Sequence, residues 1–454
     1  MKDARFGQIL EKGRDLHGSP FNLVNTEPFV RNLERLKTVG CTHDLDIATF
    51  FARKANKCLS FVHACRENGY GVDVASEIEL DQALRCGVAS GKIACTAAVK
   101  SRSLLSKCLE RDVCVVLDNS DEIDLAVSLA RDSQKTMKVA LRLSGFEHAG
   151  LRLESRFGFP VGDIGSVLSD HVLAHLELAG LHFHLDGYCY QQRVSALWQC
   201  LDVSDWILQK KGVRLGFIDC GGGVPISYLA SAEQWQGFWS RHDAALLGTG
   251  DPVTFDNDGY GRVSVDGRLF GNVKRYPFYQ ELVQEEWLAK IVNSSRRGET
   301  LGGSLAGRRL QLRLEPGRSA LDGCGVTVAE VAYRKRHSNG QILVGLAMNH
   351  TQCRTSSVDF FADPLLYRCA RPMPDQREVP TDSGFLVGSY CTESEFLSLR
   401  EFRFPEGIAV GDLVVFPNTA GYFMHFKESR SHQFPLAKNL VVTPREVRLD
   451  QIDW

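Results

Sequence analysis

The chain has 454 residues, of which 44% are hydrophobic and 24% are charged, and its formal net charge is -2. This length predicts two or three domains, and the near-neutral charge gives no reason to expect nucleic acid or an anionic membrane as a partner. No run of about 18 apolar residues occurs, and the polar N-terminus lacks the apolar core of a signal peptide, so we expect a cytoplasmic protein.

Short β-rich runs alternate with longer amphipathic stretches through most of the chain. The predicted strands are 47–53, 70–76, 92–97, 113–118, 138–144, 178–185, 215–223 and 310–317. Each strand but the last is followed by a plausible helix, such as 56–69 and 76–87, and both of these helices end at glycine. Eight units favour an α/β fold of the (β/α)8 barrel type over an open doubly wound sheet, which usually has about five or six strands.

Three regions depart from this repeat. Residues 1–40 hold one strand and one helix, which we expect to associate with a C-terminal domain. Residues 321–454 are β-rich with little helix and predict an antiparallel, β-barrel-like domain that follows a barrel at 41–320. Residues 224–309 separate the last two barrel strands by more than a βα loop needs, and we interpret them as an insert over one face of the barrel.

Fourteen cysteines are scattered along the chain without a C-x-x-C pair. That spacing fits neither a zinc cluster nor a small disulfide-linked scaffold. We therefore expect no metal, and most of these cysteines should be buried thiols in a reducing compartment.

The carboxyl ends of the strands of a (β/α)8 barrel converge on one mouth. Here those ends carry Lys54, Asp73, Arg142, His182, His184, Gly221, Gly222, Gly223, Glu315 and Arg318. A lysine amine forms an imine with an aldehyde, a glycine run lets backbone N–H groups approach a phosphate, and a carboxylate keeps a pyridine nitrogen protonated. Each feature alone is more often structural, but in barrel order they predict a phosphate-bearing aldehyde cofactor.

Seven segments resemble, in the same order, motifs of the fold-type III PLP-dependent decarboxylases, the group of ornithine, arginine and diaminopimelate decarboxylases. They are "FFARKANKC", "GVDVASEIEL", "GLHFHLDG", "CGGG", "LEPGRS", "GSYCTESE" and "VVFPNTAGYF", and they cover nearly the whole chain. The resemblance implies an alanine racemase-like barrel followed by a β domain. It also implies pyridoxal 5'-phosphate as cofactor, an amino-acid substrate, and a homodimer whose subunits share their active sites.

The resemblance also implies roles for single residues. The cofactor-binding positions fall on Lys54, Asp73, Arg142, His184, Gly222, Gly223, Glu315, Gly317, Arg318 and Tyr422. Among the catalytic residues, Lys54 would form the imine, His184 would stack on the ring, and Glu315 would partner the pyridine nitrogen. Cys391 matches the cysteine that reaches the other subunit's active site and protonates the substrate. Lys57, one helical turn beyond Lys54, is interpreted as a solvated residue.

The sequence departs from the family where substrate is bound. Diaminopimelate decarboxylases carry R-P-x-x-Y, whereas "ADPLLYR" has Asp363 in place of the arginine and retains Tyr367. Asp363 would repel a distal carboxylate and attract a distal ammonium, or it is a plain turn residue before proline. The run "CTESE" shifts Glu393 by one place from the family's C-E-S-G-D. We therefore predict Asp363, Tyr367 and Glu393 as substrate-binding residues for a diamino or substituted diamino acid of specialised metabolism, such as siderophore or antibiotic pathways.

Three alternatives stay open: a diaminopimelate decarboxylase, an amino-acid racemase and a non-catalytic PLP-binding protein. Racemases of this fold typically place arginine at the pyridine nitrogen, so Glu315 favours decarboxylation. The presence of Lys54, Glu315 and Cys391 argues against a non-catalytic binder.

Overall fold

A computed structural model of the chain describes residues 4–273, 275–355, 360–369 and 382–453. The chain divides into two compact units. The barrel unit comprises Phe29–Pro225 and Leu282–Ala320, and the sheet unit comprises Met1–Pro28, Ile226–Glu281 and Leu321–Trp454.

The barrel unit is built on eight parallel strands that close into a ring. They are β2 (Ile47–Ala52), β3 (Gly71–Val74), β4 (Ile93–Cys95), β5 (Cys114–Leu117), β6 (Met137–Ser144), β10 (Leu176–His182), β11 (Phe217–Asp219) and β16 (Gln311–Leu314). Each strand pairs with the next in this order, and β16 pairs with β2, so the ring has no free edge. All eight predicted strands are present, and the predicted (β/α)8 barrel is confirmed.

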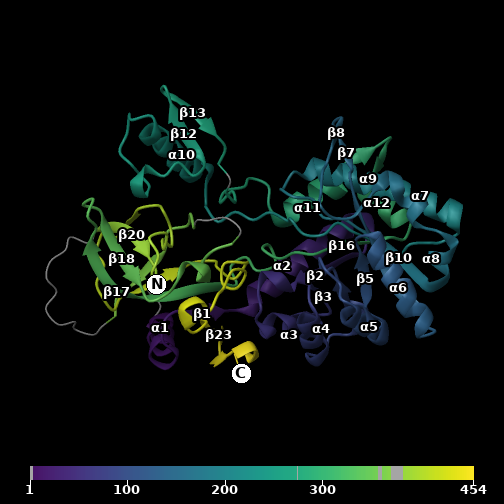
Figure 1. Ribbon diagram of the computed structural model, residues 1–454, viewed down its shortest axis with the longest axis horizontal. Coiled ribbons are helices and arrows are strands. Elements are labelled where there is room, and N and C mark those ends of the chain that lie inside the picture. The colour runs from purple at the N-terminus through teal and green to yellow at the C-terminus, as the bar shows by residue number, and fades with distance from the viewer. Residues whose placement is uncertain (1–3, 274, 356–359, 370–381, 454) are drawn as a thin grey trace. The chain divides into compact units, whose positions relative to one another are not determined.

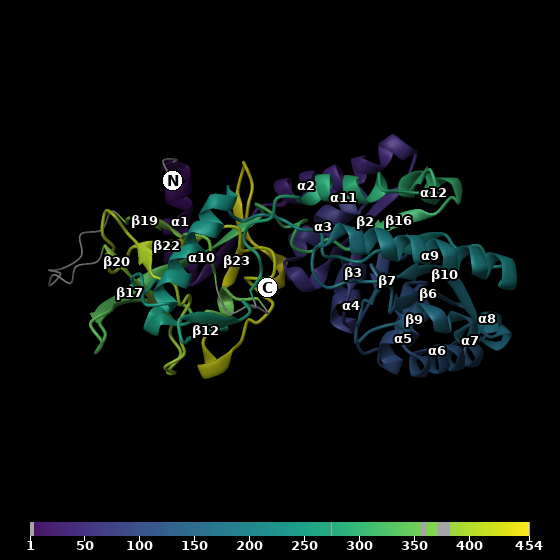
Figure 2. The ribbon, with the colours of Figure 1, turned by 90° about the horizontal axis from the view of Figure 1, so that it is seen from above.

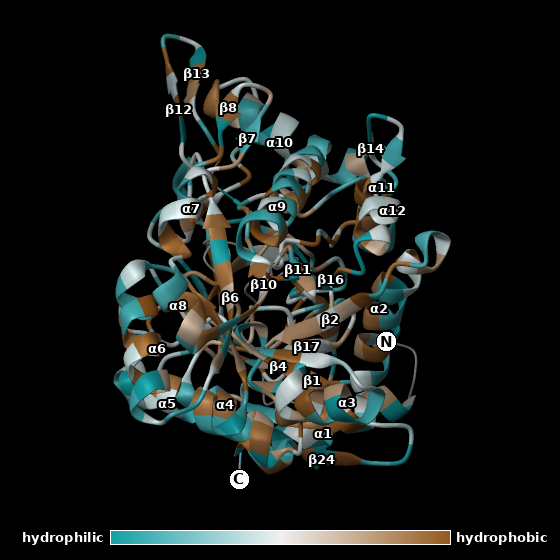
Figure 3. Ribbon diagram, turned by 90° about the vertical axis from the view of Figure 1, so that its right-hand side faces the viewer, coloured by the Kyte–Doolittle hydropathy of each residue, from teal (hydrophilic) through white to brown (hydrophobic). Residues whose placement is uncertain are grey.

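Helices lie against the outside of this ring (Figures 1 and 2). They include α3 (Leu59–Asn68), α4 (Glu77–Arg85), α5 (Arg102–Arg111), α6 (Ser120–Asp132), α8 (Asp170–His175), α9 (Tyr190–Lys211), α11 (Gln284–Val292) and α12 (Leu301–Gly307). Ser76, Ser101 and Asn119 cap the first turns of α4, α5 and α6 by accepting a backbone N–H. Figure 3 shows hydrophobic and hydrophilic residues alternating around these helices, the pattern of helices with one buried face.

The interior of the barrel is filled by side chains from strands that are not all neighbours. Cys114 and Val116 on β5, Ala140 on β6 and Phe217 on β11 form one cluster. Since β10 separates β6 from β11, this cluster crosses the inside of the ring. Asp219 follows Phe217 by two residues on the same strand and therefore points to the same side.

The sheet unit contains a nine-stranded, mostly antiparallel sheet. Its strands are β1 (Phe21–Val24), β17 (Gly325–Arg336), β18 (Ile342–Leu346), β19 (Leu365–Tyr367), β20 (Ser383–Val387), β21 (Phe402–Arg403), β22 (Leu413–Phe416), β23 (Lys438–Val442) and β24 (Val447–Leu449). The predicted C-terminal β domain is confirmed, although β1 with β23 and β18 with β20 form parallel pairs. Leu10 of α1 (Ala4–His17) packs with Phe21, Val328 and Leu413 in its core.

The compact units divide the predicted insert 224–309 between them. Residues 226–281 group with the sheet unit and contain α10 (Ala232–Leu246) and the hairpin of β12 (Arg262–Val265) and β13 (Arg268–Gly271). Residues from 282 onward group with the barrel unit. The domain boundaries at 40 and 320, and the position of the insert over the barrel, stay predictions.

All fourteen cysteines are free thiols. Cys41, Cys189 and Cys391 are exposed, Cys369 is half-buried and the others are buried, so the expected burial of most thiols is confirmed. No helix within the described ranges is both long and apolar enough to cross a bilayer.

Candidate active site

The carboxyl ends of the barrel strands bring together seven polar side chains. Lys54 follows β2, Asp73 lies in β3, Arg142 in β6, His182 ends β10 with His184 two residues later, Asp219 ends β11 and Glu315 follows β16. Six of these seven were predicted or noted from the sequence. The seventh, Asp219, was missed, although a carboxylate at the end of a strand, two residues before a glycine run, is a signal that could have found it.

Lys54 lies at the boundary between this cluster and solvent. Its side chain is 41% exposed, and Nζ lies 3.9 Å from Oδ2 of Asp73, whose side chain is 1% exposed. Oδ1 of Asp73 accepts the Thr96 hydroxyl at 2.5 Å. The lysine amine is therefore accessible to a ligand, while its neighbouring carboxylate is held inside the barrel.

Three buried carboxyl groups share this end of the barrel. Burial raises the pKa of Asp73 to about 6, and the neighbouring Glu315 adds to the rise. Burial and Glu315 likewise raise the pKa of Asp219, and burial raises the pKa of Glu315, against the opposing effect of Lys54. Three carboxyls are thus buried with too little positive charge near them, which is the condition that a cationic ligand group would relieve.

The two histidines of β10 and its loop are neutral. Burial, followed by Lys54, lowers the pKa of His184 to about 3, and burial and Arg142 lower the pKa of His182 well below its ordinary value. Nδ1 of His184 accepts the Gly222 backbone N–H at 3.1 Å, so the proton of the neutral ring is on Nε2. His182 Nε2 lies 3.3 Å from Oε1 of Glu315.

The glycine run after β11 is required by close backbone approach. A Cβ on Gly221, whose φ is +66°, would lie 2.6 Å from the Phe183 carbonyl oxygen, and one on Gly222 would lie 2.8 Å from the Glu315 carbonyl oxygen. Gly221 donates its N–H to Asp219 Oδ1 at 2.8 Å. Since the Gly222 N–H is bound by His184, the phosphate role predicted for Gly222 and Gly223 stays a prediction.

Arg142 is held by a network that sequence reasoning did not find. Its Nε lies 3.8 Å from Asp118 Oδ1, and its guanidinium carbon lies 4.2 Å from the centroid of the Phe157 ring. The Asp118 backbone N–H in turn donates to Glu122 at 2.9 Å, and Glu122 forms a fully buried ion pair with Lys100 at 2.9 Å. Asp118 directly follows β5, so the rule of strand ends could have identified it.

Gly317 and Arg318 continue the chain beyond Glu315. Gly317 is buried and Arg318 is half-buried. Their predicted phosphate contacts stay predictions, as does that of Tyr422, which belongs to the sheet unit and has a φ of +73°.

The predicted substrate residues and the predicted cysteine also belong to the sheet unit. Cys391 and Glu393 are exposed. Asp363 forms an ion pair with Arg400 at 2.7 Å, and the Tyr367 hydroxyl donates to Glu11 at 3.2 Å. Their predicted roles in the active site stay predictions.

The acidic residue that is buried in the "CTESE" run is Glu395, not Glu393. Glu395 accepts the His350 backbone N–H at 2.8 Å and also pairs with the His350 ring. The sequence shift alone could not separate the two glutamates, because the difference depends on a partner 45 residues away.

The chemistry of the barrel end fits a pyridoxal cofactor. Oε1 of Glu315 is buried and makes no hydrogen bond to a described residue, so it is available to a protonated ring nitrogen. Lys54 offers an accessible amine, and the glycine run lets the backbone pack closely against His184 and Glu315. His182, Asp219 and Glu315 also present possible metal ligands within 4.8 Å of one another, and the expectation of no metal stays a prediction.

Known proteins resemble this chain over most of its length. The family described as "Pyridoxal-dependent decarboxylase, pyridoxal binding domain" matches residues 30–241. The uncharacterised protein y4yA of Sinorhizobium fredii is 28% identical over 96% of this chain and 91% of its own. The diaminopimelate decarboxylase of Pseudomonas aeruginosa is 24% identical over 82% of this chain and 76% of its own.

Solved structures share the fold at low sequence identity. Diaminopimelate decarboxylase from Helicobacter pylori, complexed with L-lysine, has a TM-score of 0.70 and 18% identity over 97% of this chain and 95% of its own. Lysine/ornithine decarboxylase from Vibrio vulnificus, complexed with putrescine, has a TM-score of 0.68 and 16% identity over 98% of this chain and 99% of its own. Together with the chemistry of the barrel end, the family match identifies residues 30–241 as a pyridoxal-binding domain of the pyridoxal-dependent decarboxylases, and the chain as a whole is similar to the fold-type III PLP-dependent decarboxylases, carboxy-lyases that use pyridoxal 5'-phosphate.

Proposed function

We propose that this enzyme decarboxylates a diamino or substituted diamino acid, one whose distal group is an amine or amide rather than a second free carboxylate. The observation that carries this proposal is Asp363, which stands where diaminopimelate decarboxylases carry an arginine. Asp363 is 80% exposed and forms its ion pair with Arg400. The guanidinium of Arg400 is thus already matched by a carboxylate, so it is a weak binder for the distal carboxylate of diaminopimelate.

A cavity beside this ion pair supports a substituted substrate. It has a volume of about 540 Å³ and lies within the sheet unit, where Asp363 and Arg400 line it together with Trp235, Phe238 and Phe361. The rings of Trp235 and Phe361 meet edge to face, with centroids 5.4 Å apart. Aromatic walls beside a carboxylate suit an aliphatic chain that ends in an amine or carries an acyl group.

The residues of the barrel end supply the remaining parts of the proposed reaction. When bound, pyridoxal phosphate supplies an electron sink for the electron pair that remains on Cα after carbon dioxide leaves. We propose that Lys54 is the amine that attaches it, that Glu315 accepts a hydrogen bond from its ring nitrogen, and that the neutral His184 lies against its ring. In the same proposal Asp73 holds Lys54, Arg142 adds positive charge near the ring, and Gly223, Gly317, Arg318 and Tyr422 bind the phosphate.

Cys391 is the proposed donor of the proton that Cα receives after decarboxylation. Its thiol is exposed, whereas most thiols of the chain are buried. Exposure is needed because the proposed thiol acts in the active site of the partner subunit. The enzyme would then be a homodimer with shared active sites. A mixture of Lys54→Ala and Cys391→Ser chains tests this, because random exchange should restore about a quarter of wild-type activity in heterodimers. Activity no higher than that of the separate variants would count against shared sites.

The substrate proposal is tested by measuring carbon dioxide release. The panel contains lysine, ornithine, 2,4-diaminobutyrate, their distal N-acyl derivatives and meso-diaminopimelate. We expect kcat/KM for a diamino or acylated substrate to exceed that for diaminopimelate by about tenfold or more, the effect of one unfavourable charge contact. Preference for diaminopimelate would overturn the proposal, and exchange of the Cα proton without carbon dioxide release would indicate a racemase.

Variants at the ion pair sharpen the same test. Asp363→Arg should shift the kcat/KM ratio toward diaminopimelate, because it restores an unpaired cation at this position. Asp382→Asn, an exposed aspartate of the same unit outside the cavity, is the matched control and should leave the ratio unchanged. An unchanged ratio in Asp363→Arg would leave Asp363 as the plain turn residue before Pro364.

We further propose a role in specialised metabolism rather than lysine synthesis. The support is the altered substrate motif together with the low identity, 24%, to the diaminopimelate decarboxylase of Pseudomonas aeruginosa. Complementation of a lysine auxotroph that lacks its own diaminopimelate decarboxylase tests this directly, because growth without added lysine would contradict the proposal.

A further inference from the structure

A cavity of about 890 Å³ lies at the amino end of the barrel, opposite to the strand ends that carry Lys54 and Glu315. Its walls are formed by the first residues of β10, β11 and β16, by the second residue of β6, and by the turn that precedes β2. Its size is within the range of small-molecule sites, about 300–1,000 Å³. No role in the decarboxylation described above uses this end of the barrel.

Arg313 is the central charged group of this cavity. Its guanidinium carbon lies 3.5 Å from the centroid of the Phe217 ring and 4.9 Å from that of Phe50, so two rings fix its position. Its Nε donates to Gln311 Oε1 at 2.7 Å, and Gln311 donates in turn to Asp46 at 2.6 Å. The two Nη groups make no hydrogen bond to a described residue. The guanidinium group of Arg313 is therefore held rigidly through Nε, while its two Nη groups stay available to a ligand.

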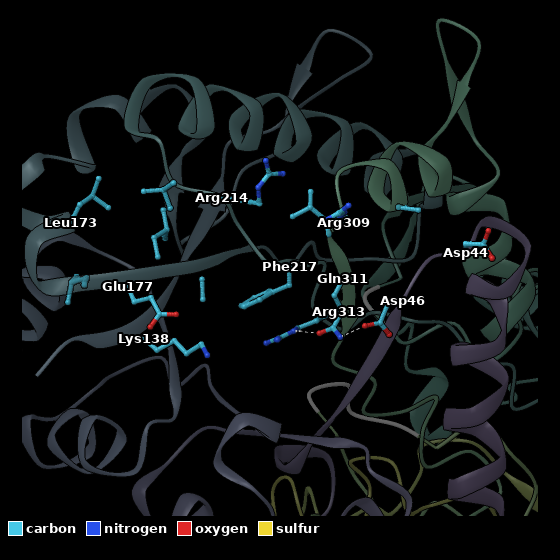
Figure 4. A pocket seen from close by; sticks show the side chains of 17 residues that line it. Asp44, Asp46, Lys138, Leu173, Glu177, Arg214, Phe217, Arg309, Gln311 and Arg313 are labelled. Atoms are coloured by element: carbon cyan, nitrogen blue, oxygen red, sulfur yellow. Dashed lines mark hydrogen bonds between the residues drawn. The ribbon is translucent and has the colours of Figure 1, made fainter.

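Lys138 faces the same space from the other side. It lies in β6 and is half-buried. Figure 4 shows the side chains of Lys138 and Arg313 pointing toward one another, with the Phe217 ring above the space between them. An ammonium and a guanidinium that converge without a carboxylate between them form an arrangement that an anion would complete.

The distribution of charge gives the sign of the ligand. Four cations and three carboxylates line the cavity: Lys138, Arg214, Arg309, Arg313, Asp44, Asp46 and Glu177. None of these seven forms an ion pair with another residue of the described ranges. The three carboxylates are exposed, whereas Arg313 and Lys138 are partly buried. Since solvent screens exposed charges more than buried ones, the charges of Arg313 and Lys138 outweigh those of the three lining carboxylates inside the cavity.

We propose that this cavity binds a small oxyanion, a carboxylate- or phosphate-bearing metabolite, between Arg313 and Lys138. The planar fork of Arg313 matches two oxygens of either group, and Lys138 adds a second charge. The site is separate from the cofactor's phosphate site, because the two lie at opposite ends of the same strands.

The test is calorimetric titration of the holoenzyme with inorganic phosphate and, separately, with succinate. Holoenzyme is used because the cofactor's own phosphate then fills its site at the other end of the barrel. We expect saturable binding of one anion per chain, and the tighter of the two anions distinguishes a phosphate from a carboxylate as the natural ligand. Arg313→Gln and Lys138→Met should each raise Kd about tenfold or more, which corresponds to about 1.4 kcal/mol per factor of ten.

Matched controls keep the result specific. Lys135→Met removes an exposed lysine three residues before Lys138 that does not line the cavity, and its Kd should equal that of the wild type. Because Arg313 stacks on two rings, its replacement can lower stability, and Arg214→Gln at the exposed rim then carries the test beside Lys138→Met. The proposal is overturned if neither anion binds saturably, or if the cavity variants bind as tightly as Lys135→Met.

Discussion

The two ends of the barrel carry opposite unbalanced charge on the same strands. The side chain of Arg313, the third residue of β16, lines the cavity at the amino end, and Glu315 directly follows β16 at the carboxyl end. At the carboxyl end burial raises the pKa of Asp219 and Glu315, whereas at the amino end burial lowers the pKa of Arg313. An apolar layer could fill either end at less cost, because burying charge without a partner is unfavourable. At both ends of the barrel, therefore, buried charges without partners mark a site where a ligand would supply the missing opposite charge.

The carboxyl end has one reactive group that the amino end lacks, and this gives the largest expected effect. Lys54→Ala should lose covalent attachment of the cofactor and at least about 1,000-fold in kcat, the scale of removing a nucleophile. Lys57→Ala, an exposed lysine three residues away, is the matched control and should stay within about twofold of wild type. Borohydride reduction followed by peptide mapping should label the Lys54 peptide, and a labelled Lys57 peptide would overturn the assignment.

The buried pair of Lys100 and Glu122 tests the claim that unpaired buried charge is costly. Lys100→Met leaves Glu122 buried without its cation, and we expect the free energy of unfolding to fall by about 3–5 kcal/mol. Lys107→Met breaks more exposed ion pairs with Asp81 and Glu77, and its loss should be much smaller because solvent screens these charges. Denaturant titration of both variants measures the difference, and equal losses would contradict the contrast.

Asp73 gives a pH-dependent form of the same comparison. In the folded chain the pKa of Asp73 is raised to about 6, whereas the ordinary pKa of an aspartate is 3.8. Between these values the folded state binds more protons than the unfolded state, so the free energy of unfolding should fall as pH rises from about 4 to about 6. Asp73→Asn removes this loss. In cofactor-free protein, the free energy of unfolding of the variant relative to that of the wild type should therefore rise by on the order of 3 kcal/mol between pH 4 and pH 8.

Thermal or denaturant unfolding at several pH values checks this prediction. Asp382→Asn, an exposed aspartate, should show no gain across the same range. A gain in Asp73→Asn that is already complete at pH 4 would show that packing, and not the charge of Asp73, sets its effect.

Local patterns were sufficient to predict the barrel but not the full site. The eight strands are short, apolar and separated by helices, and these are properties that neighbouring residues determine. Closure of the ring could be predicted as well, because eight is the number of parallel strands in a (β/α)8 barrel. Asp219 was missed because its importance depends on burial beside Glu315, which is distant in sequence. Sequence order also could not predict that residues 226–281 group with the sheet unit, since that grouping includes ring contacts such as Trp235 with Phe361, 126 residues apart.

The smallest expected effect tests whether the two ends of the barrel are coupled. Arg313 lies beside Asp219 in the pairing of β16 with β11, and its positive charge lowers the pKa of Asp219 against the larger effect of burial. Arg313→Gln removes that contribution, so the pKa of Asp219 should rise. Any transition of the bound cofactor's visible absorbance that depends on this carboxyl should then move to higher pH.

Two variants separate charge from shape in that titration. Arg313→Lys keeps the positive charge and should leave the absorbance transition close to that of the wild type, even though the planar fork is lost. Arg111→Gln removes an exposed arginine at the end of α5 and should not move the transition. A shift in Arg313→Lys as large as that in Arg313→Gln would mean that ring stacking, and not charge, connects the ends. No shift in either would mean that each end of the barrel holds its own ligand independently, because the apolar layer around Phe217 then insulates the carboxylates from the cations.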